Sequence, residues 1–111
     1  MNVNLAETEY SDNFDEHRKA RVATSQHKYG SAKINFGQRL VNAVETIELC
    51  LKKYRATHNT EYLCDLANYA MFEYMYPQFD DAYFQATSDR ESAGISGISI
   101  KEAGAYRNED C

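Results

Sequence analysis

The chain has 111 residues, enough for one domain, and 43% of them are hydrophobic, with nine tyrosines and no tryptophan. Its net charge of −5 argues against nonspecific nucleic-acid binding by the whole molecule. The basic side chains are nevertheless concentrated, because nine of the twelve lie between Arg18 and Arg55. A chain this short buries only a modest core, so we expect it to form a homo-oligomer.

The N-terminus and the cysteines both indicate a cytoplasmic protein. Residues 1–16 are polar and acidic, unlike a signal peptide. No apolar run approaches the roughly 20 residues of a membrane span, so no membrane partner is expected. Cys50, Cys64 and Cys111 are odd in number and form no CxxC pair, which is typical of a reducing compartment.

The first predicted elements are an N-terminal arm over residues 1–12 and a basic helix over residues 13–29. Asp12 or Asn13 is suited to cap this helix, and the acidic residues that follow favour its positive end. The helix carries little apolar surface. It is therefore interpreted as a solvated helix with one weak packing stripe. The functional alternative is a helix that faces an anion.

The centre of the chain predicts an antiparallel helical hairpin, with helices over residues 36–56 and 60–76. Apolar residues in the first helix are spaced by three or four, which is the helical period. The second helix is apolar over most of its circumference, and Pro77 ends it. Because such a helix needs more than one neighbour, we expect four of its aromatic residues to form a subunit interface: Tyr62, Tyr69, Phe72 and Tyr76.

The predicted fold is thus all-α, a single domain with a central hairpin, a flanking basic helix and a C-terminal strap over residues 77–111. The strap is irregular at first, and a capping-box pattern from Ser99 to Glu102 predicts a short helix over about residues 100–107.

Four carboxylates of the hairpin form two pairs, each on one helical face: Glu45 with Glu48, and Glu61 with Asp65. Converging carboxylates bind Mg²⁺, which in turn binds phosphates. At these residues the chain resembles the MazG-type nucleoside triphosphate pyrophosphohydrolases, an all-α family with an ExxE and an ExxD motif. The ExxE motif is present, whereas the second pair is spaced by four. The alternatives are solvated carboxylates, one of them paired with Arg or Lys, or Asp65 with Asn68 as a polar pair inside the hairpin.

A second resemblance covers more of the chain. The run NTEYLCDLANYAMFEYMYP, with AYFQAT and ESAGISGISIKE after it, is similar to small proteins encoded by phages and prophages. This implies a host-directed accessory role in the host cytoplasm, such as inhibition of a defence system. Such proteins include helical oligomers that sequester a cyclic-nucleotide signal and acidic proteins that block a nucleic-acid channel.

A nucleotide-binding protein needs cations for phosphate and aromatic faces for the base. The basic segment offers a candidate set of this kind: Arg18, Arg21, Lys28, Tyr29, Lys33 and Arg39. The alternative interpretation is a solvated basic face that offsets the acidic arm.

We therefore expect a non-enzymatic, phage-type binding protein without a cofactor, whose partner is a host protein or a small anionic nucleotide. Two alternatives stay open. One is a MazG-like pyrophosphohydrolase that uses Mg²⁺ at the four carboxylates, and the other is an acidic inhibitor of a host nucleic-acid-binding enzyme.

Overall fold

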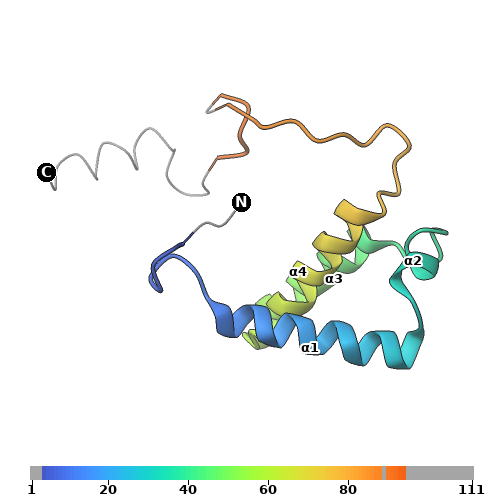
Figure 1. The fold of residues 1–111 in the computed structure, drawn as a ribbon, viewed down its shortest axis with the longest axis horizontal. Helices are drawn as coiled ribbons and strands as arrows, with labels where there is room; N and C mark the ends of the chain where they lie inside the picture. Colours follow the sequence, from blue (N-terminus) through green and yellow to red (C-terminus); the bar gives the residue numbers. More distant parts are fainter. Residues whose placement is uncertain (1–3, 89, 95–111) are drawn as a thin grey trace, which may run out of the picture.

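The computed structural model describes residues 4–88 and 90–94, and within them the chain is all-helical, as the sequence predicts. It contains α1 (Asp12–Tyr29), α2 (Ala32–Asn35), α3 (Ala43–Thr57) and α4 (Glu61–Met75) (Figure 1). The short helix predicted over residues 100–107 lies outside the described residues, as does Cys111. No helix in the described ranges is both long and apolar enough to cross a membrane.

Helix α1 begins and ends at residues suited to these positions. The Ser11 side chain accepts a hydrogen bond from the Phe14 amide at 3.0 Å, which caps the first turn. Gly30 ends the helix with a φ of 90°, a conformation that favours glycine. No residue of α1 is fully buried, and Val22 packs half-buried against the core cluster.

The prediction that one helix begins at residue 36 is wrong. The chain instead forms the short α2, turns through residues 36–42, and begins α3 at Ala43. Asn42 caps α3 by accepting a hydrogen bond from the Glu45 amide at 3.1 Å, and Arg39 adopts a φ of 58° within the turn. The helical spacing of Phe36 and Leu40 concealed this break, although Leu40 is 67% exposed.

Helices α3 and α4 lie side by side and are joined by residues 58–60 (Figure 1). His58 adopts a φ of 62° and its amide donates to the Tyr54 carbonyl at 2.7 Å, which closes the end of α3. The Asn59 side chain then accepts from the Glu61 amide at 3.0 Å. Cys50 and Cys64, one from each helix, are buried and not disulfide-bonded, so they pack as small apolar side chains.

The core is a small cluster at the junction of the α2 turn with the helix pair. The rings of Phe36 and Phe72 stack at a centroid distance of 4.7 Å, and Ala43 completes the buried cluster. Tyr69 meets Phe72 edge-on at 6.2 Å. This corrects the interface prediction for Phe72, which is 8% exposed because the same chain's Phe36 covers it.

The strap begins against the start of α3. The Gln78 side-chain amide donates to Asn42 Oδ1 at 3.0 Å, and Arg39 pairs with Asp80 at 2.5 Å. Farther on, Phe84 contacts Tyr74 edge-on at a centroid distance of 6.3 Å, but both rings remain largely exposed. The strap is therefore fixed at its first turn and leaves its aromatic side chains on the surface.

Truncation of the stacked ring tests this core. Phe36→Ala is expected to lower the free energy of unfolding by about 3 kcal/mol, because it removes a buried ring from a small cluster. The measurement is urea unfolding followed by circular dichroism. Phe84→Ala, which truncates an exposed ring, is the control; equal stability of the two variants would contradict this core.

Candidate functional site

A cavity of about 480 Å³ lies where the C-terminal half of α1 faces α2 and α4. Five aromatic side chains line it: Tyr29, Phe36, Tyr69, Phe72 and Tyr76. Its size falls within the range of small-molecule pockets, and a mainly apolar wall with few polar groups is typical of them. The cavity is therefore the candidate binding site of the described residues.

Polar groups line the cavity from α1, from the α2 region and from α4, which contributes Asp65 and Asn68. Ser25 and Gln26 line it from α1, and Lys33 and Asn35 line it from the α2 region. Asn35 also holds this corner together, because its side-chain amide donates to the Tyr29 carbonyl at 3.1 Å. The cavity thus offers hydrogen-bonding groups and one lysine beside its aromatic wall.

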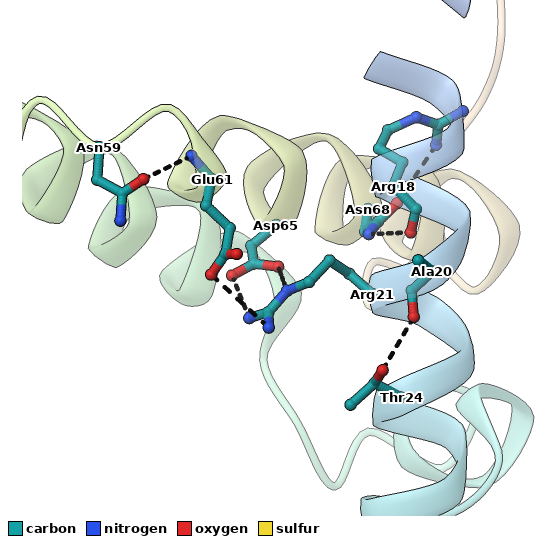
Figure 2. A network of polar contacts seen from close by, with 8 residues as sticks. All are labelled: Arg18, Ala20, Arg21, Thr24, Asn59, Glu61, Asp65 and Asn68. Carbon is teal, nitrogen blue, oxygen red and sulfur yellow. Dashed lines mark hydrogen bonds and ion pairs between the residues drawn. The ribbon is translucent and has the colours of Figure 1, made fainter. Parts of the chain in front are cut away.

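Near its middle, α1 is fixed to α4 by a bidentate ion pair between Arg21 and Asp65 (Figure 2). Arg21 Nε donates to Asp65 Oδ1 and Arg21 Nη2 donates to Asp65 Oδ2, both at 3.0 Å. Glu61 lies 3.7 Å from the same guanidinium. The hydrogen bonds from Asp65 raise the pKa of Arg21 further above its ordinary value, so the arginine stays charged.

A second polar contact lies one turn earlier on α1 (Figure 2). The Asn68 side chain is 4% exposed and donates to the Arg18 carbonyl at 3.0 Å, while Arg18 Nη1 donates to Asn68 Oδ1 at 3.3 Å. Arg18 also pairs with Asp15 at 3.2 Å. We call the contacts of Arg18 and Arg21 with Asn68 and Asp65 the polar clamp.

The six residues predicted to bind an anion do not gather at one site. The arginines pair within the chain: Arg18 and Arg21 in the polar clamp, and Arg39 with Asp80. Tyr29 and Lys33 line the cavity. Lys28 lies over the Tyr29 ring, with Nζ 5.0 Å from its centroid. Of the six residues, Tyr29 and Lys33 therefore meet at the cavity, with Lys28 beside Tyr29, and anion binding by the group stays a prediction.

The four carboxylates do not converge either. Among the described residues, no three His, Cys, Asp or Glu side chains are grouped so that they could hold a metal ion. Glu61 and Asp65 contact Arg21 instead. Glu45 is in the first turn of α3, and at 1.5 Å per residue it lies about 18 Å from the end of α3 that joins α4. The Arg-paired alternative thus describes Asp65, and the MazG-type arrangement lacks its carboxylate cluster.

Asp65 and Asn68 do not form the polar pair inside the hairpin that was one alternative. Both contact α1, and they match two arginines at the same spacing of three residues on that helix. That matched spacing was visible in the sequence as a signal for helix docking. The aromatic cavity was not, because it depends on the turn at residues 36–42.

The remaining predicted interface residues are half-buried. Tyr69 and Tyr76 pack against the core cluster and line the cavity, and Tyr62 lies near the start of α4. Burial, followed by the negative charge of Asp65, raises the pKa of the Tyr69 hydroxyl above 10.0. Burial similarly raises the pKa of the Cys50 thiol above 9.0. Both groups are therefore neutral in the folded protein at neutral pH.

No protein-family model matches the chain, and comparisons with curated proteins and with solved structures also find no match. The geometry and chemistry of the cavity therefore carry the functional proposal.

The raised pKa of Tyr69 predicts a loss of stability in alkali. The unfolded chain ionises this hydroxyl at a lower pH than the folded chain does, so stability present below the unfolded pKa is lost as pH rises through the folded one. The urea midpoint should therefore fall between about pH 7.5 and about pH 10.5, and fall less in Tyr69→Phe. An equally steep fall in both proteins would contradict the burial of this hydroxyl.

Proposed function

We propose that the protein is a non-enzymatic binding protein that holds a small aromatic compound, bearing at most one negative charge, between α1, α2 and α4. The observation that carries this proposal is the cavity of about 480 Å³, which is lined by five aromatic side chains and by Lys33. Aromatic faces stack on a planar ring system without requiring a particular substituent pattern.

The charge limit follows from where the cations are. Arg18, Arg21 and Arg39 already have acidic or amide partners in the chain. Lys33 lines the cavity, and Lys28 contacts the ring of Tyr29, which also lines it. A triphosphate chain would therefore lack the several cations or the metal ion that it needs. A cyclic mononucleotide carries one phosphate charge and is the nucleotide class that suits this cavity.

Several polar groups favour a heteroaromatic ring over a plain hydrocarbon. Ser25, Gln26 and Asn35 present hydroxyl and amide groups to the cavity and could hydrogen-bond to the edge of a base. Combined with the resemblance to phage accessory proteins, this supports a role in sequestering a host signalling nucleotide. The carboxylates held by Arg21 give no comparable support to pyrophosphohydrolase activity.

Self-association stays a prediction. With Phe72 in the core, exposed side chains near the end of α4 and in the strap are now the better candidates for a contact between copies. They include Tyr74, Met75, Tyr83 and Phe84, of which Tyr83 is 85% exposed.

A binding titration with two truncations tests the proposed site. The probes are cyclic mononucleotides and 8-anilinonaphthalene-1-sulfonate, an aromatic monoanion whose fluorescence reports binding directly. Tyr29→Ala is expected to weaken binding of the best probe about tenfold, through loss of ring stacking. Lys33→Ala should weaken it severalfold for the anionic probes, and less at high salt.

The matched controls are Tyr83→Ala and Lys52→Ala, which remove an exposed tyrosine and an exposed lysine away from the cavity. Both should bind like the wild-type protein. If no probe binds, or if Tyr83→Ala weakens binding as much as Tyr29→Ala does, the cavity is not the ligand site.

A further inference from the structure

Helix α1 forms one wall of the cavity without being part of the core. Val22, Ser25, Gln26 and Tyr29 face the cavity from successive turns. Nevertheless no residue of α1 is buried, and among the helices α1 packs chiefly against α4. The apolar contact of this wall with the core is small, with Val22 half-buried against the core cluster, so polar contacts are needed to hold the helix in place.

The polar clamp is what holds it. Arg21 makes two hydrogen bonds to Asp65, and Arg18 exchanges hydrogen bonds with Asn68. Arg18 and Arg21 lie near the middle of α1 and precede its cavity-lining residues, whereas their partners Asn68 and Asp65 are themselves part of the cavity wall. The Arg21 side chain is 43% exposed, so its ion pair is accessible to water and to dissolved salt.

The other end of α1 has the properties of a pivot. Gly30 joins α1 to α2 with a φ of 90°, and a Cβ placed on it would meet no atom within 4 Å. Gly30 thus faces open space and is not enclosed by packed side chains. The corner beyond it is fixed, because Asn35 donates to the Tyr29 carbonyl and Phe36 is buried in the core.

We propose that α1 is a hinged lid over the cavity. Gly30 is the hinge, and the polar clamp is the latch that holds the lid closed. Release of the latch swings the first turns of α1 away from α4 and exposes the aromatic wall formed by Tyr69 and Phe72. Ligand enters by this route, so the latch sets the entry rate. The role of α1 as a lid that admits the ligand rests on the proposed function, whereas the opening of α1 does not.

Hydrogen exchange measured by mass spectrometry on the full chain tests the opening itself. Once released, α1 has no buried face to stabilise it, and an isolated helix of its length is marginal in water. Arg21→Met should therefore speed exchange over residues 12–29 by about tenfold or more. Exchange over residues 43–57 of α3 should stay at the wild-type rate.

Three comparisons isolate the latch. Arg39→Met removes another exposed ion pair, with Asp80, and should leave exchange over residues 12–29 unchanged. The charge-swapped pair Arg21→Asp with Asp65→Arg should restore slow exchange. In the wild-type protein, about 0.5 M NaCl should speed exchange over residues 12–29 severalfold, and it should have little further effect on Arg21→Met.

Two exchange results would overturn the proposal. One is unchanged exchange of α1 in Arg21→Met, and the other is acceleration of α1 and α3 together, which indicates global unfolding. The wild-type salt series decides the same question if the variant does not fold.

Stopped-flow binding of 8-anilinonaphthalene-1-sulfonate tests whether α1 acts as a lid that limits ligand entry. The binding rate should level off at high probe concentration in the wild-type protein, because opening limits entry, and it should be severalfold faster in Arg21→Met. Equal binding rates in the two proteins would overturn the role of α1 as a lid, while the cavity would remain the binding site. If the probe binds neither protein, the proposed function fails, and exchange still decides whether α1 opens.

Discussion

The polar clamp between α1 and α4 is the interaction on which the arrangement of the site depends. Helix α1 contributes no buried side chain, so its position is set by hydrogen bonds from Arg18 and Arg21 to Asn68 and Asp65. Of these four, Asn68 is the residue that is almost completely buried, and each of its side-chain atoms is paired. A buried amide left without a partner costs about 1 to 3 kcal/mol, which makes this contact specific as well as stabilising.

The cavity follows from this mode of attachment. The clamp holds α1 near its middle, at Arg18 and Arg21, and the cavity lies beside the later turns of the helix. The core is confined to Phe36, Ala43 and Phe72 with their neighbours, so Tyr69 and Tyr76 are only half covered and their rings remain accessible to a ligand. The same feature leaves α1 less extensively packed on α4 than α3 is.

The sequence predicted the helices better than it predicted their contacts. The helical spacing of the apolar residues and Pro77 identified the all-α class and the end of α4, whereas the predicted cap of α1 at Asp12 or Asn13 was wrong, because Ser11 caps it. The break before Ala43 was missed, since Phe36 and Leu40 keep the helical period across the turn. Of the six predicted ligand-binding residues, Tyr29 and Lys33 line the cavity, whereas the arginines pair within the chain, because a sequence does not show which cations pair internally. The carboxylates Glu61 and Asp65 failed as metal ligands for the same reason.

The central claim is that α1 covers the aromatic wall of a ligand cavity in solution. Its most direct test is a nuclear Overhauser measurement on methyl-labelled protein, which detects protons about 5 Å apart or closer. Cross-peaks are expected between the Val22 methyl groups and the rings of the core cluster, since Val22 packs against that cluster. Addition of the aromatic monoanion should replace or shift these cross-peaks and leave those between α3 and α4 in place. Absence of any contact from Val22 to these rings would contradict the account.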